Sequence, residues 1–293
     1  MLLALEVLQI IAPVILLSGI GFAWAALGFE YKVQFVTRLT MNLSVPALIF
    51  TALIKTEIDP AALKVVAIAS ALAYLGVGLL LVVILRLMRF NLRTFLAPLV
   101  FGNTGNLGLP LAFFAFGQAG FEYAVVVFAV MGFISFTLGV WLVSGNASPL
   151  GAVKQPIVWA TVVGSLFLTQ GWSLPRWSMN TLELLGQVAI PLMLITLGVA
   201  ITRLKPAALG RAFGLSLLKL VVCVCVPAAI GIWMGLPPIA LAALVVQVAT
   251  PVAVTSYMLA EKYGADPEEV AGLVVVSTLL SIVAIPLILA ATL

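Results

Sequence analysis

The sequence contains no histidine, only two cysteines and few charged residues. Charged side chains make up 8% of its 293 residues, whereas soluble proteins carry about 25%. Without histidine the chain forms neither a serine–histidine pair nor a histidine metal site, and no pair of aspartates lies inside an apolar run. We therefore expect a protein that is not an enzyme and that needs no cofactor or metal ion.

Apolar residues, by contrast, make up 64% of the chain. They form runs long enough to cross a bilayer, which takes about 20 residues per helix. We expect an all-α integral membrane protein with ten transmembrane helices, numbered in chain order at residues 7–28, 36–54, 62–87, 95–116, 122–144, 156–172, 183–201, 208–234, 238–260 and 268–291.

Basic residues in the short connections predict the orientation. The cytoplasmic side of a membrane protein is enriched in lysine and arginine, and ten basic residues fall on one side when the first connection is placed inside. Only Lys55, Lys64 and Arg176 then lie outside. Both termini are therefore expected to be non-cytoplasmic. Because the basic residues lie in separate loops, the net charge of +4 does not indicate nucleic-acid binding.

Two pairs of segments indicate an internal repeat. Residues 45–63 and 190–209 each open with an aliphatic residue and proline and end in Pro-Ala-Ala-Leu. Residues 117–122 and 264–269 each place a glutamate five residues after a glycine. We expect five helices in residues 1–145 and five in residues 150–293. Because each half has an odd number of crossings, the second is inverted relative to the first.

The fourth and ninth predicted helices each contain a polar, helix-breaking segment. Freed backbone groups are tolerated at membrane depth only where they are buried in protein or line an aqueous cavity, so two such breaks predict crossed broken helices around a transport site. The alternative is that the prolines only kink these helices and the polar side chains bond to neighbouring helices. The candidate substrate-binding residues are Asn103, Thr104, Asn106, Pro110, Gln247, Thr250, Pro251, Thr255 and Ser256.

Lys219 is the main charge inside a predicted span. Counted from the helix start near Ala207 at about 1.5 Å per residue, it lies close to the middle of the bilayer, where a lysine needs a partner. No acidic residue lies at mid-helix to pair with it. Either backbone carbonyls satisfy it as a structural cation, or it compensates the charge of an anionic substrate or titrates during transport.

Other polar residues carry weaker interpretations. Cys223 and Cys225 lie within the eighth predicted helix and are interpreted as apolar filling rather than a metal site. Ser277, Thr278 and Ser281 of the tenth helix are candidates for cation coordination, but helix packing is the simpler interpretation.

Three motifs resemble the auxin efflux carrier family. They are Asn-Thr-Gly-Asn-Leu-Gly-Leu-Pro-Leu at 103–111, Pro-Val-Ala-Val-Thr at 251–255 and Glu-Lys-Tyr-Gly-Ala-Asp at 261–266. The resemblance spans essentially the whole chain and implies a fold similar to bile acid sodium symporters. It implies a scaffold of helices 1, 2, 6 and 7, a mobile core of helices 3–5 and 8–10, elevator-type alternating access and a homodimer through helices 2 and 7.

The chain departs from the plant auxin exporters at several points. The connection at 145–155 is short, which points to a prokaryotic relative in the plasma (inner) membrane. Ser256 and Met131 stand where those exporters have a proline and a site glutamine, and residues 62–87 contain no acidic side chain. Auxin specificity is therefore unsupported.

These features together predict a secondary transporter of a small organic anion, a carboxylate or an auxin-like acid. A proton or a sodium ion is the candidate coupling ion, and membrane lipid is the surrounding partner. The alternatives are a cation/proton antiporter of related fold, which lacks its usual carboxylate here, and a membrane sensor, which has no need of two broken helices.

Overall fold

The computed structural model describes residues 2–144, 155–202 and 208–292, and within these ranges the chain is helical, with one isolated β-bridge. The α-helices are α1 (Leu2–Ala26), α2 (Val33–Leu39), α3 (Val45–Lys55), α4 (Pro60–Leu87), α5 (Leu92–Val100), α6 (Leu109–Ile134), α7 (Val140–Ser144), α8 (Pro156–Gln170), α9 (Arg176–Gln187), α10 (Ala189–Ile201), α11 (Leu209–Trp233), α12 (Pro238–Val248), α13 (Val254–Tyr263) and α14 (Pro267–Thr292). Three π-helical segments join some of them: η1 (Thr40–Ser44), η2 (Thr104–Gly108) and η3 (Ser135–Gly139).

Seven helical stretches in the described residues are long and apolar enough to cross a membrane. They are Leu8–Ala26, Val33–Lys55, Pro60–Leu87, Thr104–Ser144, Arg176–Ile201, Leu209–Trp233 and Pro267–Thr292. The sequence predicts ten spans because it counts the ninth across an interruption, counts the 15-residue α8 as a span, and separates the fourth from the fifth near Gly117. Gly117 has non-helical backbone angles inside α6, which marks a kink at that point. The inverted five-plus-five arrangement stays a prediction.

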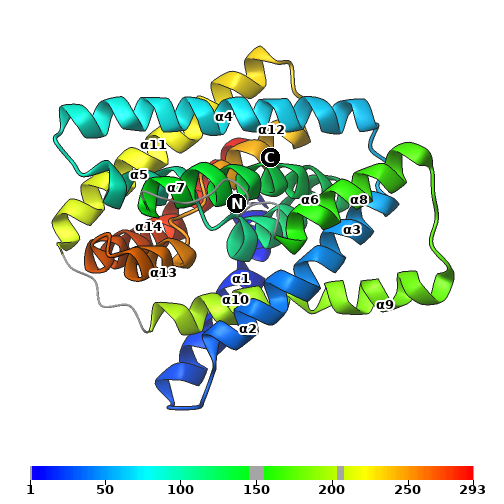
Figure 1. The fold of residues 1–293 in the computed structure, drawn as a ribbon, viewed down its shortest axis with the longest axis horizontal. Helices are drawn as coiled ribbons and strands as arrows, with labels where there is room; N and C mark the ends of the chain where they lie inside the picture. The colour runs from blue at the N-terminus through cyan, green and yellow to red at the C-terminus, as the bar shows by residue number, and fades with distance from the viewer. Residues whose placement is uncertain (1, 145–154, 203–207, 293) are drawn as a thin grey trace.

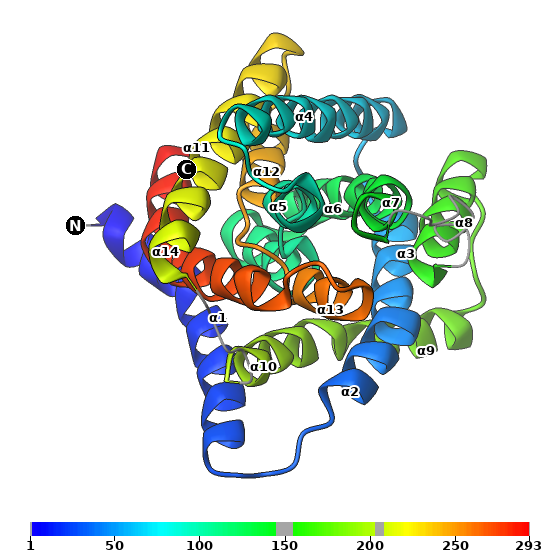
Figure 2. The ribbon, with the colours of Figure 1, turned by 60° about the vertical axis from the view of Figure 1, so that its left-hand side comes forward.

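The helices surround a central group that contains both interrupted segments. In Figures 1 and 2, α4 lies near the top, α10 lies near the bottom, and α5, α6, α12 and α13 lie between them. α1 packs along α10, and α3 packs against α8 and α9. The predicted scaffold helices thus contact one another.

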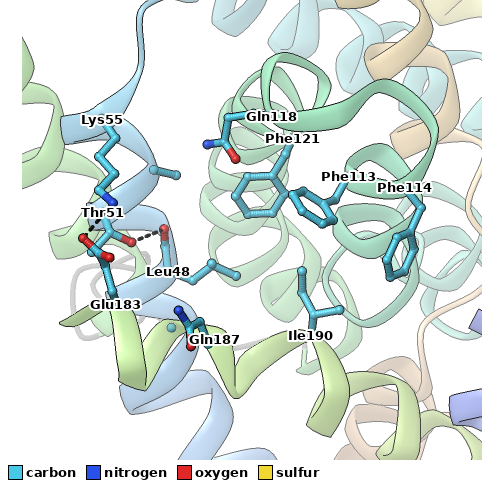
Figure 3. Close-up of a pocket in the computed structure, with 12 residues that line it drawn as sticks. Leu48, Thr51, Lys55, Phe113, Phe114, Gln118, Phe121, Glu183, Gln187 and Ile190 are labelled. Carbon is cyan, nitrogen blue, oxygen red and sulfur yellow. Dashed lines mark hydrogen bonds and ion pairs between the residues drawn. The ribbon is translucent and has the colours of Figure 1, made fainter. Parts of the chain in front are cut away.

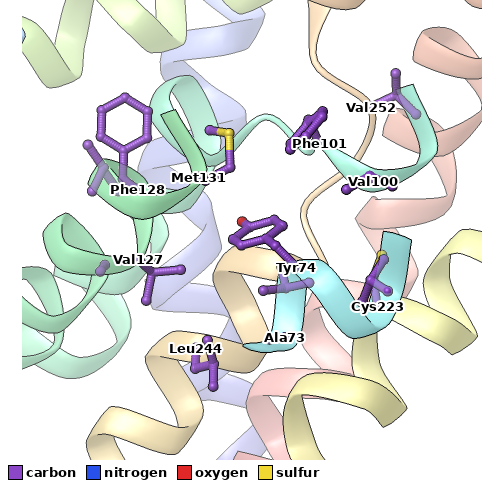
Figure 4. Close-up of a cluster of buried hydrophobic side chains, with 14 of the residues drawn as sticks. Ala73, Tyr74, Val100, Phe101, Val127, Phe128, Met131, Cys223, Leu244 and Val252 are labelled. Atoms are coloured by element: carbon purple, nitrogen blue, oxygen red, sulfur yellow. The ribbon is translucent and has the colours of Figure 1, made fainter. Parts of the chain in front are cut away.

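A buried cluster beside the interrupted segments forms part of the core. The Tyr74 ring of α4 stacks on Phe101 with 6.2 Å between centroids, and Val127, Met131 and Cys223 lie around it (Figure 4). Because Phe101 belongs to the first interruption, the apolar core packs directly against a non-helical segment. Burial of this surface stabilises the position of the break.

Polar contacts tie together segments that are predicted to share one side of the membrane. Arg93 donates to the carbonyls of Val143 (2.8 Å) and Tyr263 (2.5 Å), all three on the predicted cytoplasmic side. On the predicted outer side, Lys55 pairs with Glu183 at 2.7 Å. The contacts therefore agree with the predicted grouping of loops, while the identity of the cytoplasmic side stays a prediction.

The contact between α1 and α10 depends on glycine. A Cβ added at Gly198 would lie far inside van der Waals contact with the Ser18 carbonyl, and one added at Gly21 would collide with the backbone of Ile195. Small residues let transmembrane backbones approach closely, and dispersion and weak hydrogen bonds then hold them together.

We predict that Gly198→Ala destabilises the protein by roughly 1–3 kcal/mol, because the backbone of α1 must move away. Gly132→Ala is the matched control, since an added Cβ there meets nothing within 4 Å; it should leave stability unchanged or raise it by up to about 1 kcal/mol. Thermal unfolding of purified protein in detergent measures both. Equal midpoints for the two variants would contradict the close approach.

Candidate functional site: the paired helix breaks

The first break separates α5 from η2. The last hydrogen bond of α5 runs from the Phe101 amide to the Ala97 carbonyl at 2.9 Å, and the chain is then non-helical through Asn103. The helical path resumes when the amides of Leu107 and Gly108 both donate to the Asn103 carbonyl, at 3.0 and 3.1 Å. Pro110 is the second residue of α6, which continues η2 directly, and it has no N–H to donate to the preceding turn.

The second break separates α12 from α13. α12 ends at Val248, and the chain is non-helical from Ala249 to Ala253. Thr250 Oγ1 donates to the Gln247 carbonyl at 2.7 Å and so caps the end of α12. Pro251 cannot donate to the helix that precedes it.

The two breaks bond to each other. The Asn103 amide donates to the Pro251 carbonyl at 2.7 Å, and Gly102 and Val252 form the isolated antiparallel bridge. Position 102 requires glycine, because an added Cβ would collide with both the hydroxyl and the carbonyl of Thr250. Some of the backbone N–H and C=O groups that lack helical partners at the two breaks are thereby hydrogen-bonded to each other, which buried backbone groups require.

Polar side-chain atoms at this junction have no hydrogen-bond partner among the described residues. They are Asn103 Nδ2, Thr104 Oγ1 and both amide atoms of Gln247. Thr104 and Gln247 are completely buried, and Asn103 is 5% exposed. A buried polar group without a partner costs about 1–3 kcal/mol, so such a concentration calls for a functional explanation.

The structure brings together part of the predicted site. Asn103, Thr104, Gln247, Thr250 and Pro251 lie at the junction and are buried. Pro110 is also buried, at the start of α6.

The remaining predicted residues lie where solvent or lipid reaches them. Asn106 and Ser256 are half-buried, and Thr255 is exposed in the first turn of α13. The sequence pattern groups these residues because they are close along the chain. In the structure, the helical path of α13 leaves the Thr255 side chain exposed and outside the buried group.

Helix ends give the junction its electrostatic character. η2 and α13 each begin two residues after the Gly102–Val252 bridge. The first N–H groups of a helix have no partner within it and carry about half a positive charge. Two such ends close together favour an anion.

Lys219 of α11 is buried, with 2% of its surface exposed, and contacts the opposite kind of helix end. Its Nζ donates to the Leu99 carbonyl in the last turn of α5 at 3.1 Å. Cys223, expected from the sequence to be apolar filling, is buried and also has its Sγ 3.7 Å from both Lys219 Nζ and the Leu99 carbonyl. No ion pair in the described part of the chain includes Lys219. The contact matches the interpretation in which carbonyls satisfy the ammonium.

A cavity of about 410 Å³ lies between α6 and the helices α3, α9 and α10. Figure 3 shows Phe113, Phe114 and Phe121 on one wall and the Lys55–Glu183 ion pair on the other. Sequence reasoning used Lys55 only for orientation and missed this cavity. Its lining comes from segments far apart in the chain, so no local motif could have revealed it.

Glu122 is a buried carboxylate near this cavity that the sequence interpretation used only as part of the repeat. It accepts hydrogen bonds from Thr56 Oγ1 and from Gln118 Nε2, the latter at 2.8 Å. The sequence signal for it was an acidic residue inside an apolar segment, five residues after Gly117.

We predict that Gln247→Met does not destabilise the fold and raises its stability by up to about 1–3 kcal/mol, because it removes two unpaired buried polar atoms at similar length. Gln118→Met, which removes an amide that is bonded to Glu122, is the control and should give no gain. Thermal unfolding without added ligand compares them. A marked loss of stability in Gln247→Met alone would show that this amide is structural.

Comparison with known proteins gives the family. The model of a membrane transport protein family matches residues 6–150 and 140–289, two segments that overlap at 140–150, around the predicted border of the halves. An uncharacterized transporter of Methanothermobacter thermautotrophicus is 25% identical over 304 aligned residues, covering 95% of this chain and 96% of that protein. The motifs at the two breaks led to the same assignment: the chain belongs to the membrane transport protein family, which is the family of the auxin efflux carriers.

Proposed function

We propose that this multi-pass membrane transporter carries a small organic anion, a carboxylate or an auxin-like acid, and that the paired helix breaks bind it. The observation that supports the proposal most strongly is the set of unpaired amide and hydroxyl groups buried where two interrupted helices meet. A ligand that accepts hydrogen bonds would satisfy Asn103 Nδ2 and Gln247 Nε2, and pocket groups of this kind fix a ligand's orientation.

The charge of the junction favours an anion over a cation. The N-terminal ends of η2 and α13 are positive, and neither 101–111 nor 247–256 contains an aspartate or glutamate. A cation/proton antiporter needs an ionisable carboxylate at this place. The buried Glu122 lies instead near the 410 Å³ cavity, already bonded to Thr56 and Gln118.

We further propose elevator-type alternating access, as in the family. The scaffold comprises α1–α3 and α8–α10, and the mobile core comprises α4–α7 and α11–α14. Two cavities support this division, because both lie along the border: the 410 Å³ cavity between α6 and the scaffold, and a 300 Å³ apolar cavity between α1 and α10 on one side and α6 and α14 on the other. A border that is incompletely packed offers less resistance to sliding.

A homodimer through the second and seventh predicted helices completes the proposal. Leu39 at the end of α2 and Leu43 in η1, and likewise Leu184 of α9 and Val188 directly after it, are exposed apolar residues spaced four apart, about one helical turn. Such residues suit contact with a second copy within the lipid. We place the protein in the inner membrane of a prokaryote, with a proton or sodium ion as the coupling ion.

The binding proposal predicts that an organic acid raises the thermal midpoint of the purified protein, since ligand binding stabilises the native state. Asn103→Ala should weaken this response about tenfold or more, because one lost directional hydrogen bond costs about 1–3 kcal/mol. Ser70→Ala is the control: Ser70 is buried in α4 and bonded only to its own helix, and it should respond like wild type. Equal responses of the two variants would rule out the junction as the binding site.

The orientation predicts that cysteines introduced at positions 2 and 292 react with a membrane-impermeant thiol reagent in intact cells. The chain offers an internal comparison, since a cysteine at Arg89, between α4 and α5, should react only after the cells are opened. The reverse pattern would invert the topology without affecting the proposed binding site.

A further inference from the structure

The interruption after α5 leaves the Leu99 carbonyl without its helical donor. In a continuous α-helix this carbonyl would accept from the amide of residue 103, four positions later. The Asn103 amide donates instead to Pro251, at 2.7 Å. Lys219 Nζ lies 3.1 Å from the Leu99 carbonyl, so an ammonium N–H takes the place of the lost backbone donor.

Lys219 also lies near the end of α12. Lys219 lines a cavity of about 10 Å³ together with Ala249 and Pro251 of the second break and with Ser216 and Ser277. Each helix C-terminus carries about half a negative charge, and α5 and α12 both end at this junction. The buried Lys219 therefore contacts the negative end of α5 and shares a cavity lining with the residues that follow α12.

We propose that Lys219 is the resident cation of the junction. In other transporters, a bound sodium ion is coordinated by the carbonyls that unwound helices expose. Here the Lys219 ammonium takes the place of that ion at the carbonyl ends of α5 and α12. The protein consequently binds no sodium ion at the junction, and of the two proposed coupling ions the inference favours the proton. Taken with the proposed function, the inference means that sodium is not needed to assemble the anion site.

The size and lining of the small cavity support this assignment. About 10 Å³ accommodates at most one water-sized sphere, so a hydrated ion does not fit. A bare cation there would lie beside the ammonium of Lys219 and be repelled by its charge. Ser216 Oγ is buried in the same lining and has no partner in the described residues, which offers a hydrogen bond to a single water molecule instead.

The test uses the purified full-length protein and needs no organic anion, so its outcome is separate from that of the proposed function. Thermal midpoints of wild type and Lys219→Ala are measured at equal ionic strength in sodium, potassium and choline chloride. Both are then titrated with propylammonium chloride, which matches the fragment deleted by Lys219→Ala, and with 1-propanol as its uncharged equivalent. Leu215→Ala is the control variant, because Leu215 is equally buried on the same helix but apolar.

We expect the wild-type midpoint to be the same in sodium and choline salts. Lys219→Ala should have a lower midpoint that rises saturably with propylammonium and does not rise with 1-propanol, by mass action on the folded state. Leu215→Ala should lose stability without any such rescue.

A saturable stabilisation of wild type by sodium over potassium and choline would overturn the proposal, as would a Lys219→Ala variant as stable as wild type. If Lys219→Ala does not fold, Lys219→Arg takes its place with the wild-type comparison. It keeps the charge, so it should fold and be indifferent to sodium. A sodium requirement in Lys219→Arg, or a sodium effect on wild type, would then contradict the resident cation.

Discussion

This structure depends on the pairing of backbone groups where helices are interrupted, as in the hydrogen bond from the backbone N–H of Asn103 to the Pro251 carbonyl. A membrane interior supplies no water to backbone groups that leave a helix, so each broken helix must find its partner within the protein. Here the backbone groups of one break pair with those of the other. The requirement explains why residues about 150 positions apart lie side by side, and why glycine occupies position 102, where any Cβ would strike Thr250.

The same pairing produces the chemical features of the junction. Because the Asn103 amide turns to Pro251, the Leu99 carbonyl is left to Lys219. Near the end of α12, the side-chain amide of Gln247 is enclosed against Gly108 and has no hydrogen-bond partner among the described residues. The loss of helix at the two breaks thus leaves unpaired side-chain donors and brings helix ends close together at the junction. We propose that these features let a transporter with so few charges bind an anion in an apolar surrounding.

Much of this could be predicted from the sequence. Apolar runs with few charged residues indicate the helices, and the glycines and prolines at 102–110 and 251 indicate the non-helical segments between α5 and η2 and between α12 and α13, because these residues disrupt helical hydrogen bonding. The family followed from the same segments. Lys219 could be recognised from depth alone, since a lysine is rare at mid-membrane.

The rest depends on tertiary geometry that a linear pattern does not contain. The partner of Lys219 is a backbone carbonyl, which every residue possesses, so no side-chain motif marks Leu99. Thr255 is exposed although it adjoins the break, because the turn of α13 directs it away. The number of spans differs partly because two helical parts meet at the Gly117 kink within α6, where the sequence places the border between its fourth and fifth helices. The short α8 and the interrupted ninth predicted helix account for the other two.

The central claim is that the paired breaks hold the transported anion. The most direct measurement is an electron cryomicroscopy structure of the protein bound to an organic acid that stabilises it. We expect ligand density within hydrogen-bond distance of the side-chain amides of Asn103 and Gln247. Density confined to the cavity beside Lys55 and Glu183, with both amides still unpaired, would contradict it.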